Sequence, residues 1–249
     1  MRILGPNSIG LINISDNVIL SANAMLELQD LKKGSLGVIS HSGSLIGALL
    51  AHGHSRGIGF SKLVSVGNEL DLSVGEIGKM LVNDPNTETI ILFLETLRNS
   101  NVVAEMSRMA HAAGKQIICY KLGKSELSKE LAKSHTGAIA GNDDAFNAFI
   151  NYHGIARVEI FETLIEIPNL FKNKKRSESK RVGIVTTTGG GGAMVVESLS
   201  GSDIEIIDPG LSIKKVMQDN NIAFNNNRLV DLTIAGTTSE IVNDVILSL

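Results

Sequence analysis

The run Thr89-Ile90-Ile91-Leu92-Phe93-Leu94 decides the fold of this chain. Five apolar residues follow a β-branched threonine, too few for a helix and without the polar alternation of a half-buried strand. Such a run predicts a strand buried on both faces, as in a parallel sheet covered by helices. A helical pattern at 101–113 and a second strand-like run at 116–121 follow it. The sequence therefore predicts a strand, a helix and a parallel strand in succession.

The same alternation extends in both directions from this strand. Before it, we predict strands at 36–40 and 62–66 and helices at 44–52 and 73–82. After it we predict a helix at 143–152, strands at 182–187, 203–207 and 230–232, and helices at 191–200, 212–219 and 239–249. The pattern indicates the α/β class, with two flavodoxin-like, doubly wound parallel-sheet domains, the second of them partial.

Two segments interrupt the alternation. The run at 2–7, Arg-Ile-Leu-Gly-Pro-Asn, is typical of the tail of a strand that ends in a turn. Because no partner strand precedes it, we expect an upstream domain that is missing or supplied by another chain. The polar, charged run at 172–181 predicts a solvated linker between the two domains.

Composition excludes several classes of protein. The 249 residues carry a net charge of -3, which gives no electrostatic reason to expect a nucleic acid partner. No apolar run approaches the ~20 residues of a membrane span, and no signal peptide opens the chain. The single cysteine, Cys119, cannot form an internal disulfide, and the histidines lack metal-ligand spacing. We expect a cytoplasmic protein without membrane association or a structural metal.

The main candidate for chemistry is His135, in the run Lys-Ser-His-Thr-Gly-Ala-Ile-Ala-Gly at 133–141. Hydroxyl and small side chains flank the histidine, and no apolar periodicity indicates a helix or a strand. The run is interpreted as a mobile loop that exposes an imidazole. A neutral imidazole is a nucleophile toward phosphorus, and a loop can carry what it accepts to a second place. We therefore predict that His135 is transiently phosphorylated.

Two strand-to-helix turns and one carboxylate are predicted at the edge where open parallel sheets bind ligands. Each turn offers backbone amides and a positive helix N-terminus to an anion, and we expect both to face one phosphate on the His135 loop. Glu95, directly after the 89–94 strand, is expected to accept a hydrogen bond from one ring nitrogen, so that the other is the nucleophile. The role of His41, inside the first turn, stays open. The predicted phosphate-binding residues are Ser42, Gly43, Ser44, Gly190, Gly191 and Gly192.

Stricter nucleotide and nucleophile patterns fail. The dinucleotide fingerprint needs a glycine where Met194 stands, and a P-loop ending at 123–125 needs one where Ile118 stands. The run at 53–57 matches a nucleophile elbow as a string, but it follows a helix rather than a strand. A nicotinamide oxidoreductase is therefore disfavoured.

In these residues the chain resembles the NDP-forming acyl-CoA synthetases, the superfamily that includes succinyl-CoA synthetase. The matching segments are 5–11, 40–45, 56–62, 65–68, 93–95 and 134–141, with a looser likeness at 189–192 and 230–232. The resemblance implies that His135 is the phosphorylated histidine and Glu95 the carboxylate that steadies it. It places Gly67 and Asn68 in a substrate loop. Segment 1–33 then follows a missing CoA-binding domain, 34–172 is the ligase domain, 173–181 the linker and 182–249 the second domain.

The resemblance also implies a reaction, its substrates and its partners. An acyl-CoA, ADP (or GDP) and phosphate would give the free acid, CoA and the triphosphate, reversibly, through an acyl phosphate and a phosphohistidine. CoA, ADP or ATP and Mg²⁺ would be bound mainly by domains outside this chain, with no tightly bound cofactor here. A CoA-binding domain, an ATP-grasp domain or subunit, and a small carboxylic acid or acyl-CoA are the expected partners, in a homo- or hetero-oligomer.

A second hypothesis belongs to another class of protein. Because the CoA-binding and ATP-grasp domains are absent from the chain, it could be a non-catalytic scaffold or regulatory module that keeps the same fold. The acyl group and the choice between ADP and GDP stay open from the sequence.

Overall fold

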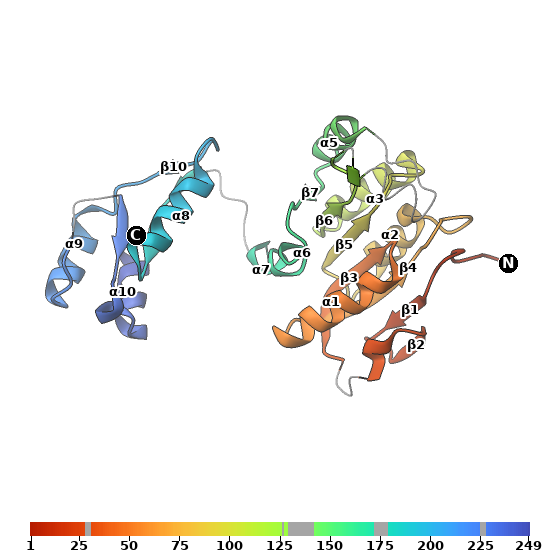
Figure 1. The fold of residues 1–249 in the computed structure, drawn as a ribbon, viewed down its shortest axis with the longest axis horizontal. Coiled ribbons are helices and arrows are strands. Elements are labelled where there is room, and N and C mark those ends of the chain that lie inside the picture. Colours follow the sequence, from red (N-terminus) through yellow and green to blue (C-terminus); the bar gives the residue numbers. More distant parts are fainter. Residues whose placement is uncertain (28–30, 126, 129–141, 172–178, 225–227) are drawn as a thin grey trace. The chain divides into compact units, whose positions relative to one another are not determined.

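The computed structural model describes residues 1–27, 31–125, 127–128, 142–171, 179–224 and 228–249 (Figure 1). The chain divides into two compact units, Met1–Lys174 and Lys175–Leu249, and each has its own core. Among the described residues, none of the helices has the length and apolar character that crossing a bilayer requires.

A seven-stranded sheet organises the first unit, with its strands in the order β2-β1-β4-β3-β5-β6-β7. The bounds are β1 Gly10–Asn13, β2 Val18–Ser21, β3 Lys33–Ser40, β4 Phe60–Ser65, β5 Thr89–Leu94, β6 Gln116–Lys121 and β7 Ala156–Arg157. From β4 to β7 all neighbouring strands are parallel. Taken in chain order, these strands stand as 2-1-3-4-5 across the sheet, the flavodoxin-like arrangement. The predicted fold class is confirmed.

Helices cover both faces of this sheet (Figure 1). The described helices are α1 Gly43–Ser55, α2 Val74–Asn83, α3 Ser100–Ala112, α5 Asp143–Tyr152, α6 Thr163–Glu166 and α7 Pro168–Phe171, with the 3-10 turn η1 Ala24–Glu27. Helices α2, α3 and α5 pack on one face and helices α1 and α6 on the other. The double cover explains why the 89–94 run has no polar position: Leu92 points into the first core and Ile91 into the second.

The N-terminal segment differs from the prediction. Residues 2–7 form no strand, because Gly5 and Asn7 have positive φ angles of 107° and 59° and Pro6 has no amide hydrogen for a ladder. The first strand is instead β1, which pairs antiparallel with both β2 and β4. The sheet is therefore mixed at this edge rather than wholly parallel.

The second unit has two parallel strand pairs, β8 with β10 and β9 with β11. Its elements are β8 Arg181–Val182, β9 Ile184–Thr186, α8 Gly189–Leu199, β10 Glu205–Ile206, α9 Gly210–Asp219, β11 Leu229–Asp231, η2 Ile234–Gly236 and α10 Ser239–Ser248. The single strand predicted at 182–187 is wrong, because the chain is divided at Gly183 into two strands with different partners. A Cβ at Gly183 would lie 2.6 Å from Cδ2 of Leu249, so a larger residue here would displace that side chain.

Candidate functional site

The carboxyl ends of β3 and β5 form the edge at which predicted residues gather. These strands are neighbours, yet the chain leaves β3 through α1 on one face and leaves β5 through α3 on the other. Helices diverge at such a switch point, which is where open parallel sheets bind ligands. The turn after β3 carries Ser42, Gly43 and Ser44, and the bend after β5 carries Glu95.

The turn after β3 leaves the amino end of α1 open to an anion. Ser42 is the N-cap residue, but no side chain caps the helix and the first turn holds no acidic residue. The Ser42 and Ser44 hydroxyl oxygens lie 3.1 Å apart. A Cβ at Gly43 would lie 2.5 Å from Cγ2 of Ile9, so glycine allows the close packing of this turn. Uncapped amides and the helix dipole together favour a negative charge here.

Glu95 is a buried residue, only 6% exposed, rather than a solvated charge at a strand end. Its backbone amide donates a hydrogen bond to Nδ1 of His41 over 2.9 Å. Within the described part of the chain, its carboxylate forms no hydrogen bond or ion pair. A buried carboxylate of this kind can accept a strong hydrogen bond from a cationic or N–H donor.

His41, whose role the sequence left open, contacts Glu69, a site residue that the sequence did not reveal. The His41 ring is buried below the turn, and its Nε2 lies 2.7 Å from Oε1 of Glu69. The other carboxylate oxygen of Glu69 accepts from the amide of Val74, the first residue of α2. Both ring nitrogens of His41 are therefore used within the protein. Because Glu69 stands 28 residues after His41 and belongs to no motif, no sequence signal marked the pair.

The two predicted substrate-loop residues follow β4 at the same edge. Gly67 is buried, with a φ of 56°, and a Cβ there would lie 2.1 Å from the carbonyl oxygen of Pro6. Asn68 is exposed, and its amide donates to the same carbonyl over 2.9 Å. The N-terminal segment thus packs on this loop, and of the two residues only Asn68 presents a side chain.

The predicted phosphohistidine, His135, lies in 129–141 and so outside the described residues. The chain before it is placed at the candidate edge, because β6 ends at Lys121. That residue is in register with Leu94, which directly precedes Glu95. The segment that carries His135 therefore starts from the strand next to the one that carries Glu95.

A buried ion network joins the two sides of that segment. Nζ of Lys121 lies 3.5 Å from Oδ1 of Asp143, and Nη1 of Arg157 lies 3.0 Å from Oδ2. Burial raises the pKa of Asp143, but the two cations outweigh it and hold that pKa below the ordinary value of 3.8. The network fixes the start of α5 to the end of β6, so both ends of the intervening segment are anchored.

The network predicts an acid-dependent stability. Because the pKa of Asp143 is lower in the folded than in the unfolded state, its negative charge stabilises the fold. This contribution is complete well above pH 3.8 and is lost as the pH falls through the lowered pKa. We expect Asp143→Asn to lower the free energy of unfolding by about 1–3 kcal/mol at pH 7 and by less at pH 3. Urea denaturation at both pH values measures the free energy of unfolding. The matched control is Asp144→Asn, because Asp144 is exposed. An equal loss at both pH values would contradict the role of the Asp143 charge.

The glycine turn of the second unit opens α8, which starts at Gly189 rather than at 191 as predicted. No side chain caps this helix either. Gly190 is exposed, whereas Gly192 is buried and a Cβ there would lie 2.4 Å from Cδ2 of Leu229. The turn therefore offers amides near Gly190 and Gly191, while Gly192 serves close packing.

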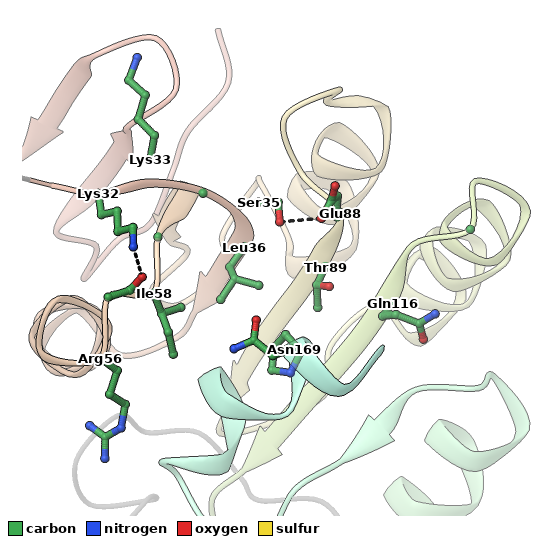
Figure 2. A pocket seen from close by; sticks show the side chains of 15 residues that line it. Lys32, Lys33, Ser35, Leu36, Arg56, Ile58, Glu88, Thr89, Gln116 and Asn169 are labelled. Atoms are coloured by element: carbon green, nitrogen blue, oxygen red, sulfur yellow. Dashed lines mark hydrogen bonds between the residues drawn. The ribbon is translucent and has the colours of Figure 1, made fainter. Parts of the chain in front are cut away.

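A cavity of about 550 Å³ lies at the opposite, amino-terminal edge of the sheet (Figure 2). Its cations already bind protein groups: Lys32 donates to the Gly57 carbonyl, and Arg56 pairs with Glu166 at 2.7 Å. None of the predicted site residues lines it. Because ligands of such sheets bind at the carboxyl ends, we do not assign the site to this cavity.

No metal site is formed by the described residues, which contain no group of three or more His, Cys, Asp or Glu side chains that could hold an ion. We assign none of these residues to Mg²⁺. The Cys119 thiol is buried, and burial raises its pKa to about 12, so it is a core side chain rather than a ligand or nucleophile.

Comparison with known proteins places this geometry in context. Residues 33–171 match the family described as succinyl-CoA ligase like flavodoxin domain. The chain is 33% identical, over 80% of its length, to "Acetate--CoA ligase [ADP-forming]" of Methanocaldococcus jannaschii, of which it covers 27%. It is 30% identical, over 84% of its length, to "Acetate--CoA ligase [ADP-forming] I subunit alpha" of Pyrococcus furiosus, of which it covers 44%. The chain thus spans less than half of either relative.

A solved structure is similar over the whole chain. It is the "dinucleotide forming Acetyl-coenzyme A synthetase 1" of Ca. Korarchaeum cryptofilum, in complex with phosphate and ADP. The TM-score is 0.83 at 26% identity, and the match covers 100% of this chain and 53% of that one.

Proposed function

The chain belongs to the succinyl-CoA ligase like flavodoxin domain family, and on that basis we propose that it is part of an ADP-forming acyl-CoA synthetase. One observation carries the proposal beyond family membership. The uncapped turn at 42–44 and the buried carboxylate of Glu95 share the sheet edge from which the His135 segment departs. Phosphoryl transfer is catalysed mainly by positioning and charge stabilisation, which an anion cradle and a carboxylate beside a histidine nucleophile would supply.

The proposed reaction has three balanced steps. An oxygen of inorganic phosphate attacks the thioester carbonyl of the acyl-CoA, the C–S bond breaks, and CoA leaves as a thiolate that takes up a proton. A ring nitrogen of His135 then attacks phosphorus, and the P–O bond to the acyl group breaks to release the carboxylate. Finally an oxygen of the ADP β-phosphate attacks the phosphohistidine, the P–N bond breaks and ATP is formed. Every step is reversible.

Each residue of the site has a place in this scheme. Amides and hydroxyls at Ser42, Gly43 and Ser44 would hold the phosphoryl oxygens, since a helix N-terminus favours the charge of phosphate. Glu95 would accept a hydrogen bond from the ring nitrogen of His135 that does not react, which fixes the tautomer and stabilises the charge that develops on the ring. Of the glycines at 190–192, Gly190 and Gly191 would offer amides for a second phosphate cradle, and Gly192 would allow the close packing behind it.

The proposal also concerns what lies outside this chain. CoA, the nucleotide and Mg²⁺ would be held mainly by a CoA-binding domain and an ATP-grasp domain or subunit, with Mg²⁺ neutralising the phosphates of the nucleotide. The Pyrococcus furiosus relative is named as an α subunit, which supports an assembly with a partner subunit. Because CoA and ADP are metabolites of the cell interior, we place the enzyme in the cytoplasm.

An assay of the full-length enzyme with its partner subunits tests the proposal. With acetyl-CoA, ADP, phosphate and Mg²⁺, we expect free CoA and ATP to form in equal amounts, and the reaction to stop when any one substrate is omitted. Acetyl-CoA is the first probe because both named relatives are acetate–CoA ligases. Propionyl-CoA and larger acyl-CoA thioesters extend the test to other acids. A complete assembly that turns over none of them would favour the scaffold hypothesis instead.

A further inference from the structure

The buried pair of His41 and Glu69 has no part in the scheme above. The two side chains are 5% and 1% exposed. Burying a carboxylate and an imidazole is costly unless all of their polar atoms are satisfied, and here they are. Such a pair needs a structural or functional explanation.

The hydrogen bonds fix the protonation of the His41 ring. The amide of Glu95 can only donate, so Nδ1 of His41, 2.9 Å away, must present a lone pair. Nε2 then carries the ring proton and donates it to Oε1 of Glu69 over 2.7 Å. A doubly protonated ring would lose the bond to Glu95. The arrangement therefore holds a neutral ring in one tautomer.

Glu69 is itself held in place. Its Oε2 accepts from the amide of Val74 over 2.7 Å, at the positive end of α2. Its backbone has a φ of 50°, a left-handed conformation that is uncommon for glutamate. The carboxylate is thus anchored on a helix N-terminus and presents one oxygen to His41.

The contact to Glu95 lies just beyond the sheet. The ladder between β3 and β5 ends at the pair Ser40 and Phe93, and the amide of His41 donates to the Phe93 carbonyl over 3.1 Å. Beyond that pair the β-ladder has ended, and the next hydrogen bond between the two segments is the one from the Glu95 amide to the His41 ring. One chain of hydrogen bonds therefore joins the ends of β3, β4 and β5.

We propose that His41 is a positioning residue, held as the Nε2-protonated tautomer by Glu69, that fixes the main chain of Glu95 relative to the phosphate-binding turn at 42–44. The inference rests on the proposed function, because it assigns His41 to the geometry of phosphoryl transfer. Both ring nitrogens of His41 are bonded within the protein, so the ring has no free polar atom to offer to substrate or phosphate. Since the bond holds the backbone of Glu95, its loss shifts the carboxylate rather than removing it.

Single-turnover phosphorylation of the full-length enzyme by acetyl phosphate tests this assignment. We expect His41→Phe, which keeps a ring but removes both bonds, to slow labelling by about 10–100-fold with the half-saturating acetyl phosphate concentration little changed. His41→Gln can accept from Glu95 and donate to Glu69, so it should restore most of the rate. His111→Gln, on the exposed end of α3, is the matched control. Wild-type rates in His41→Phe, or no rescue in a folded His41→Gln protein, would overturn the inference.

A second measurement does not depend on activity, and it uses the conservative variant His41→Gln only to assign the signals. Nitrogen-15 NMR of the wild-type protein labelled at histidine reports the protonation of each ring nitrogen, and the signals missing from His41→Gln identify His41. At pH 7 we expect a proton on Nε2 alone, and a proton on Nδ1 would overturn the inference. A wild-type protein that acetyl phosphate does not phosphorylate would instead count against the proposed function, so the two failures are distinguishable.

Discussion

Replacing His135 with alanine in the full-length enzyme is expected to abolish acid-labile phosphorylation and to lower ATP formation from acyl-CoA by about 10⁴-fold or more. Alanine has no lone pair that can attack phosphorus, so the route through a phosphoenzyme is closed rather than slowed. Binding and charge stabilisation by the remaining groups leave only a residual rate. Two readouts measure the change: label retained from acyl phosphate, and ATP formed in the steady state.

The matched control is His111→Ala, in the last turn of α3, which removes an exposed histidine. It should label and turn over as the wild-type protein does. If the His135→Ala and wild-type proteins label equally, the histidine mechanism is wrong, whatever the turnover.

Replacing Glu95 with glutamine is expected to slow phosphoryl transfer by about 10²–10³-fold, the loss that follows removal of one preorganised electrostatic group. Glutamine nearly matches the volume of glutamate and keeps an acceptor, so the fold and the amide bond to His41 should survive. What is lost is the negative charge that favours a cationic ring during transfer. Rapid-quench measurement of the labelling rate at saturating acyl phosphate isolates this step.

Glu105→Gln is the control for Glu95→Gln, because Glu105 is exposed on α3 and pairs with Lys79 over 2.9 Å. We expect a labelling rate unchanged within about twofold, since exposed ion pairs contribute little. Thermal unfolding of both variants checks that the fold is kept. A Glu95→Gln enzyme that transfers phosphoryl as fast as Glu105→Gln would remove Glu95 from the site.

The buried part of the fold could be predicted from the sequence because its pattern is local. Strands β5 and β6 and helix α5 have the predicted bounds, since each is a continuous apolar run or an amphipathic segment with a clear start. Asn142, for example, caps α5 through its side chain, which accepts from the amides of Asp144 and Ala145. The predicted helix at 73–82 is α2, shifted by one residue because Ser73 is its cap.

The edges of the sheet could not be predicted in the same way. Strands β1 and β2 have four residues each, too short a pattern to match the six-residue run that marked the centre. The three apolar residues of β2, Val18, Ile19 and Leu20, are exposed rather than buried. Among the described strands, β2 pairs only with β1, and β1 joins the sheet through β4, about 50 residues later in the chain. Gly183 similarly divides the apolar run that predicted a single strand. Strand β8 before it pairs with β10, and strand β9 after it pairs with β11.

For the site, the sequence predicted that the turn at 42–44 and Glu95 share one sheet edge, but not what links them. Turns and strand ends are local features, so Ser42 and Glu95 could be assigned to one edge from the order of strands alone. The link between them is not local. His41 contacts residues 28 and 54 positions away, and Glu69 has no motif of its own. Such pairs become visible only when the strands are placed side by side.

Site mapping of the phosphorylated enzyme tests the central claim most directly. The full-length protein, treated with acetyl phosphate and digested at neutral to alkaline pH, is analysed by mass spectrometry for the modified residue. We expect one phosphoryl group on His135, lost when ADP is added and recovered as ATP. A phosphoryl group on another residue, or ATP formation with His135 unmodified throughout, would contradict the account.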